Sequence, residues 1–135
     1  MNPVLARLIL AAGLAFSSSM TLSAQDLPGQ AWLVVSIGGE ALAAQPPATF
    51  RFEADGRVSG STGCNRFMAS YTLEGARLRF SQAAGTRMAC PAGLMAQEQR
   101  FLAALDEVTR VEMAAQGAVI LAGDRGELFR LVPLR

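Results

Sequence analysis

The sequence predicts a β-rich α+β fold in one domain. Short apolar segments that alternate with polar residues recur between glycine-containing turns, which is typical of antiparallel strands. A single segment near residue 100 has helical spacing instead. The length of 135 residues is that of one domain with a leader.

The amino terminus resembles a secretory signal peptide over residues 1–24. Arg7 precedes a run of nine apolar residues, 8–16, and small residues follow near Ala24, after which we expect cleavage. Nine apolar residues are too few for a membrane span, which needs about 20. No cysteine lies near the cleavage position to carry a lipid. We therefore expect a periplasmic or secreted protein with a leader at 25–30 and the domain at 31–135.

The first strands follow directly. Residues 31–37 are apolar and β-branched and predict the first strand, whereas residues 40–47 predict a connecting loop because they end in Pro46 and Pro47. Residues 49–53 alternate with period two, and an Asp55-Gly56 turn leads into a second strand at Val58. Residues 75–80, 117–122 and 126–131 each begin with a turn glycine and predict three further strands.

One α-helix is predicted over about 91–106. Pro91 suits a first helical turn, and large apolar residues recur at spacings of three, four and seven: Leu94, Met95, Phe101, Leu102, Leu105 and Val108. We expect this stripe to pack against the sheet. Glu98 lies on the same stripe, so its carboxylate either reaches solvent at the edge or pairs with Arg66 or Arg87.

Two cysteines suggest a disulfide between Cys64 and Cys90, because an even pair in an exported protein normally oxidises. The alternative is a reactive thiol whose pKa is lowered by Arg66 or Arg87. No CxxC spacing and no histidine base support that alternative.

A set of motifs around these cysteines resembles the META domain family, also called HslJ-like. They are G-C-N-x-F, T-x-M-A-C-P and M-x-x-E-x-x-F-L-x-x-L, in the family's order and spacing over residues 32–133. Residues 68–70 depart from the family, which often has a glycine there. The motif residues are Gly63, Cys64, Asn65, Phe67, Thr86, Met88, Ala89, Cys90, Pro91, Glu98 and Phe101.

The resemblance implies a cracked antiparallel β-barrel of about 7–8 strands crossed by one helix. It also implies a bacterial envelope protein linked to stress or antibiotic resistance, with no catalytic residues and no cofactor to assign. Residues 59–67 themselves predict a turn bonded by its own Ser, Thr and Asn side chains. The alternative is an anion cradle, although the lysine and the following helix of a phosphate loop are missing.

Composition excludes most catalytic chemistry. All 12 basic residues are arginine, so mechanisms that need lysine or histidine are excluded. The net charge is only +1, whereas nucleic-acid binding normally requires many basic residues to contact phosphates, so the charge does not indicate such binding.

We therefore expect a non-enzymatic monomer that binds an envelope protein or an apolar small molecule. The alternatives are an envelope enzyme that uses a carboxylate pair or a thiol, and a small hydrolase inhibitor.

Overall fold

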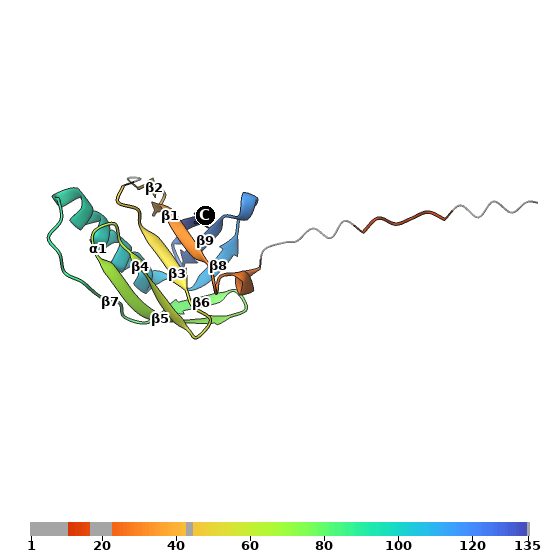
Figure 1. Cartoon of the computed structure of the whole chain (residues 1–135), viewed down its shortest axis with the longest axis horizontal. Coiled ribbons are helices and arrows are strands. Elements are labelled where there is room, and N and C mark those ends of the chain that lie inside the picture. Colours follow the sequence, from red (N-terminus) through yellow and green to blue (C-terminus); the bar gives the residue numbers. More distant parts are fainter. Residues whose placement is uncertain (1–10, 17–22, 43–44, 135) are drawn as a thin grey trace, which may run out of the picture.

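Antiparallel strands form a barrel beside one long helix (Figure 1). The computed structural model describes residues 11–16, 23–42 and 45–134. Most of the predicted signal peptide, residues 1–24, lies outside the described residues, so its cleavage after Ala24 stays a prediction.

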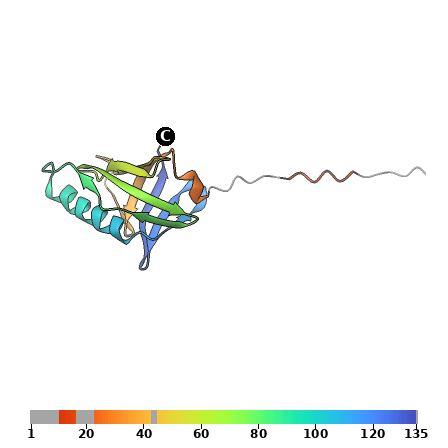
Figure 2. The same ribbon diagram turned by 90° about the horizontal axis from the view of Figure 1, so that it is seen from below.

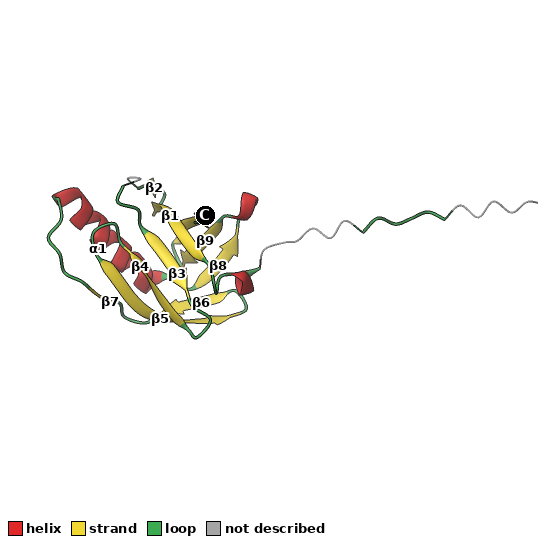
Figure 3. Ribbon diagram, in the orientation of Figure 1, coloured by secondary structure: helices red, strands yellow, loops and turns green. Residues whose placement is uncertain are grey.

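Figure 3 shows that strands dominate the structure and that α1 is the one long helix of the described chain. The strands are β1 (Ala31–Ile37), β2 (Glu40–Ala41), β3 (Thr49–Phe52), β4 (Arg57–Ser61), β5 (Arg66–Glu74), β6 (Arg77–Phe80), β7 (Ala84–Gly85), β8 (Arg110–Met113), β9 (Val119–Gly123) and β10 (Gly126–Pro133). The helices are α1 (Ala92–Glu107) and two short 3-10 turns, η1 (Ala24–Asp26) and η2 (Ala115–Gly117).

Eight of the described strands close the barrel in the order β1, β3, β4, β5, β6, β8, β9, β10 and back to β1. Strands β2 and β7 lie off this ring and pair with β1 and β5. The predicted β-rich barrel of about 7–8 strands with one helix is confirmed, but the ring is closed and not cracked, because β10 pairs with β1. Its narrowest seam is β6 with β8, where Arg77 opposite Arg110 is the one register pair. Strand β6, one of the two strands of this weak seam, is followed in the chain by β7.

An aromatic cluster fills the barrel. Phe50 is fully buried, and its ring centroid lies 5.2 Å from those of both Phe101 and Phe129. Phe67 lies 5.1 Å from Phe101. Burying each such side chain stabilises the fold by roughly 1.5 to 3 kcal/mol. Phe101 thereby anchors α1 to the strands and fixes the helix position.

The predicted first strand and the hairpin of β3 and β4 are confirmed. The loop predicted over residues 40–47 is wrong at its start, because β2 turns back and pairs Ala41 with Ser36. The sequence analysis assigned no separate strand to β5, β7 or β8. Strand β7 has two residues, which is too short for a period-two pattern.

The leader predicted at residues 25–30 contacts the barrel. Leu27 has no exposed surface and belongs to the hydrophobic core. The amide of Gly29 donates a hydrogen bond to the carbonyl of Phe52 at 2.7 Å. Leu27 and Gly29 therefore attach this otherwise largely exposed segment to the domain.

Helix α1 begins after Pro91, close to the predicted start, but its predicted buried stripe is partly wrong. Phe101 and Leu105 are buried, while Met95 and Leu102 remain 42% and 38% exposed. Gln97 is buried in their place because its amide donates to the carbonyl of Thr62 at 2.8 Å. The helix therefore has a second face that exposes Met95 and Leu102 and lines a cavity together with β7. Figure 2 shows the helix from below the barrel.

Candidate functional site

The turn between β4 and β5 is held by its own side chains, as predicted. The hydroxyl of Thr62 accepts hydrogen bonds from the amides of Cys64 at 3.2 Å and Asn65 at 3.0 Å. The hydroxyl of Ser61 accepts from the amide of Gly63 at 3.0 Å. Because these amides already have acceptors, the structure favours the self-bonded turn over the anion cradle.

Gly63 is required at this turn for two reasons. Its φ of +96° is a conformation that side chains with a Cβ rarely adopt. A Cβ there would also lie 2.5 Å from the buried Gln97 amide nitrogen.

The predicted disulfide between Cys64 and Cys90 is confirmed. The two Cα atoms are 5.9 Å apart, and neither cysteine is free. The bond links the turn to residue 90, two positions before α1 begins. The alternative of a reactive thiol is wrong for this oxidised form, because both sulfur atoms are bonded to each other.

Asn65 is the centre of the motif cluster and is 4% exposed. Its side-chain oxygen accepts from the amide of Met88 at 2.7 Å and from the hydroxyl of Thr86 at 3.0 Å. Its side-chain nitrogen donates to Glu98 at 3.1 Å. One asparagine thus joins the turn, the segment after β7 and the helix.

Glu98 forms neither of the two arginine pairs considered from the sequence. It is half-buried, and its carboxylate accepts hydrogen bonds from the hydroxyl of Thr62 at 2.9 Å and from Asn65. No ion pair in the described chain includes it. A carboxylate on the apolar side of a helix is tolerated here because two donors from the turn satisfy it.

The motif residues divide into three groups. The polar cluster brings together Gly63, Cys64, Asn65, Thr86, Met88, Cys90 and Glu98. Phe67 and Phe101 belong to the aromatic core. Ala89 is exposed and Pro91 is the residue that precedes α1, so neither joins the cluster.

A cavity of about 880 Å³ lies between β7 and α1. We call it the β7–α1 groove. Its lining comprises Thr62, Asn65, Arg66, Phe67, residues 82–89, Met95, Glu98 and Leu102. Asn65, Thr86, Met88 and Glu98 of the polar cluster belong to the lining. Asn65 connects the two walls, because it contacts the β7 side through Met88 and the α1 side through Glu98.

The groove exposes large apolar side chains. Met88 is 57% exposed, and Met95 and Leu102 are the two helix residues that the sequence analysis assigned to the core. All three line the cavity. Sequence reasoning misplaced Met95 and Leu102 because an apolar residue facing a groove has the same helical spacing as one facing the core.

The groove carries two cations without ionic partners. Arg66 and Arg87 are exposed, line the cavity and belong to none of the six ion pairs of the described chain. The third ionised group is Glu98, whose carboxylate is already bonded to the turn. The groove therefore combines an apolar surface with a net charge of +1.

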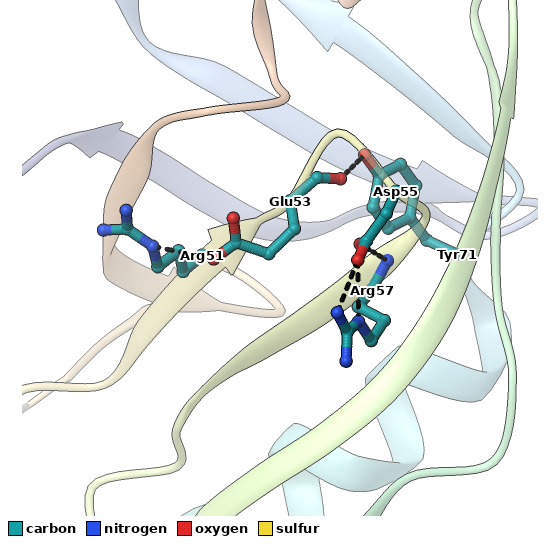
Figure 4. A network of polar contacts seen from close by, with 5 residues as sticks. All are labelled: Arg51, Glu53, Asp55, Arg57 and Tyr71. Atoms are coloured by element: carbon teal, nitrogen blue, oxygen red, sulfur yellow. Dashed lines mark hydrogen bonds and ion pairs between the residues drawn. The ribbon is translucent and has the colours of Figure 1, made fainter.

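A second polar network lies at the hairpin of β3 and β4 (Figure 4). The hydroxyl of Tyr71 donates to the carbonyl of Glu53 at 2.5 Å, and burial, together with the charges of Asp55 and Glu53, raises the pKa of Tyr71. Hydrogen bonds with Arg57 lower the pKa of Asp55 and raise that of Arg57. Both partners of that ion pair are exposed, so this network stabilises the hairpin and forms no cavity.

Most acids outside the motif are similarly engaged. Six of the ten acids other than Glu98 form ion pairs with arginines on the surface of the described chain: Glu40, Glu53, Asp55, Glu107, Glu112 and Glu127. The described helices include none that is long and apolar enough to cross a membrane.

The fold and the cluster define a class of small antiparallel barrels in which a disulfide-linked turn is tied to a single helix. The META domain model matches residues 25–134 of this chain, which therefore belongs to the META domain family. The range begins within the leader predicted at 25–30, in agreement with the burial of Leu27.

Two solved structures have a similar fold. The NMR structure of a protein from Burkholderia xenovorans is 31% identical, with a TM-score of 0.64, and the match covers 82% of this chain and 85% of that one. A second NMR structure, also with a TM-score of 0.64, is 24% identical over 82% of this chain and 94% of its own. No curated protein matches the chain.

Proposed function

We propose that this protein is an exported, non-enzymatic binding module of the bacterial envelope, and that the β7–α1 groove receives an apolar ligand or a partner protein. Export is supported by the amino-terminal sequence and by the disulfide, which is typical of oxidising compartments. The family supports a role in envelope stress or antibiotic resistance.

The observation that supports binding most strongly is the exposure of Met88, Met95 and Leu102 along one cavity. Large apolar side chains that gather around a concave surface mark binding sites, because their exposure to water is unfavourable until a partner covers them. The walls are fixed in advance by Asn65 and the disulfide. A fixed groove loses little conformational entropy on binding.

Catalysis is disfavoured by the side chains around the groove. Glu98 is the one carboxylate that lines it, and no second acid or base is present in the lining to share proton transfer. The amides of the neighbouring turn, those of Gly63, Cys64 and Asn65, already donate to side-chain hydroxyls, so they offer no oxyanion site.

Methionine methyl groups provide a direct test. We would label the methionines with ¹³C and titrate the protein with decanoate, an anionic probe with a ten-carbon chain. We expect the methyl signals of Met88 and Met95 to shift. Met68 is 62% exposed but lies outside this groove, and Met113 is half-buried, so their signals should not move.

A matched pair of variants completes the test. Met95→Gln combined with Leu102→Gln keeps good helix formers but removes apolar contact, and should weaken decanoate binding at least about tenfold. Met68→Gln should leave it unchanged. Equal shifts at all described methionines, or equal affinity in both variants, would show that the groove is not the binding site.

A further inference from the structure

The outer edge of β7 has main-chain groups that point away from the barrel. The amide of Thr86 donates to the carbonyl of Arg66 at 3.0 Å, and the amide of Met88 donates to the side chain of Asn65 at 2.7 Å. Successive residues of an extended strand direct their N–H and C=O groups to opposite sides. Gly85 and Arg87 therefore direct theirs away from β5, toward the groove side.

No neighbouring strand covers this edge in the part of the chain that the structure describes. The amides of Ala83 and Arg87 donate no hydrogen bond there, and β7 pairs with β5 alone. Across the groove lie the side chains of α1, not another strand. The edge is thus a row of unpaired main-chain donors and acceptors beside an apolar wall.

We propose that an extended peptide segment of a partner protein adds to this edge as a further antiparallel or parallel strand. Its alternate apolar side chains would pack on Met95 and Leu102, and a carboxylate of the segment would meet the unpaired arginines of the lining, Arg66 and Arg87. The proposal rests on the proposed function, since it places the partner in the same groove.

Main-chain pairing explains why the edge and the apolar wall occur together. Strand addition draws its affinity from main-chain hydrogen bonds and its specificity from alternate side chains. From residue 83 to residue 87 the edge extends about 13 Å, enough for four or five residues of a partner strand.

Charge favours an acidic peptide over a neutral one. Four described arginines lack an ion pair, namely Arg66, Arg77, Arg79 and Arg87, and two of these line the groove. The carboxylate of Glu98 forms no ion pair with either arginine, so the lining keeps a net charge of +1. A carboxylate on the partner would supply the missing counter-charge.

The edge is also held rigidly. Gly85 lies so close to β5 that a Cβ would overlap the carbonyl oxygen of Arg66. Together with the bonds of Thr86 and Met88, this contact fixes the strand before any partner arrives. A preformed edge lowers the entropy cost of adding a strand.

The test uses a defined probe, the peptide acetyl-Thr-Ile-Asp-Ile-Thr-amide, with the ¹⁵N-labelled protein. We expect the amide signals of Gly85 and Arg87 to shift and their exchange with solvent to slow. Two N-methylated analogues of the peptide distinguish the two edges of its strand. One carries N-methyl groups on both Ile residues, and the other carries them on the two Thr residues and Asp, so each analogue blocks the N–H groups along one edge. One analogue should lose at least tenfold in affinity and the other should bind nearly as well as the parent.

Charge variants provide the second arm. The double variant Arg66→Gln, Arg87→Gln should lower the affinity for the peptide at least threefold. Replacing the Asp of the peptide by Asn should have a similar effect. Arg79→Gln, an unpaired arginine outside the groove, should leave binding unchanged.

The outcomes separate this inference from the proposed function. If decanoate shifts Met88 and Met95 but the peptide does not bind, or if both N-methylated analogues bind as tightly as the parent, strand addition is overturned and the groove remains a binding site. If neither probe perturbs the groove, both proposals fail.

Discussion

Replacing Asn65 by aspartate tests the centre of the motif cluster. The substitution Asn65→Asp keeps the shape and the oxygen that accepts from Thr86 and Met88. It replaces the donor that lies 3.1 Å from the carboxylate of Glu98 with a second carboxylate oxygen. Two like charges then face each other at a site that is nearly closed to solvent.

The cost is limited by proton uptake. Two unit charges about 3 Å apart repel by about 5 kcal/mol at an effective dielectric constant of 20. Keeping one carboxyl group protonated at pH 7 when its ordinary pKa is near 4 costs about 4 kcal/mol, because each pH unit above the pKa costs about 1.4 kcal/mol. Proton uptake costs less than charge repulsion and therefore sets the loss. We expect the free energy of unfolding to fall by about 3 to 4 kcal/mol at pH 7.

The pH dependence follows from the same argument. The folded variant binds one more proton than the unfolded chain, so its stability falls as pH rises. The loss should be small near pH 4 and should grow by about 1.4 kcal/mol per pH unit up to about pH 7.

Urea unfolding at pH 5, 6 and 7 measures this loss through the fluorescence of Trp32, the one tryptophan, which is buried. The double variant Asn65→Asp with Glu98→Gln places a donor on the helix and should restore more than half of the stability. An equal loss at pH 5 and pH 7, or no recovery in the double variant, would refute the assigned contact.

Three further changes test other parts of the structure. Cys64→Ser or Cys90→Ser should lower the free energy of unfolding by about 3.5 kcal/mol, the chain-entropy value for a separation of 26 residues; a loss below 1 kcal/mol would argue against the crosslink. Tyr71→Phe should cost about 1 kcal/mol by removing the bond to Glu53. Because folding raises the pKa of this single tyrosine, wild-type stability should fall above about pH 10, and an absorbance titration that gave an unperturbed value would contradict this. Leu27→Ala should cost about 2 to 5 kcal/mol, whereas no change would show that the leader does not pack on the core.

The strands with clear periodicity and the helix could be predicted from the sequence. Strand β1 and the hairpin around Asp55 have strong local patterns, and α1 has apolar residues at helical spacing over 16 residues. Strand β7 could not be found in this way. Its two residues become a strand because Gly85 allows close approach to β5, which is a tertiary contact.

The candidate site was predictable in its parts and not in its arrangement. The motif indicated Asn65 and Glu98, but not that one donates to the other, since they are 33 residues apart. Helical spacing placed Met95 in the core because spacing does not distinguish a groove from an interior. The buried Gln97 gave no sequence signal, because its partner is a carbonyl in the distant turn.

The central claim is that the β7–α1 groove is where this protein meets its partner. Site-specific photocrosslinking in the cells that produce the protein tests it most directly. A benzophenone side chain would replace Met95 in the groove or, as the control, Met68, which is exposed outside it. We predict a discrete adduct, lipid or protein, from position 95 and none from position 68. The same adducts from both positions, or adducts from position 68 alone, would contradict the claim.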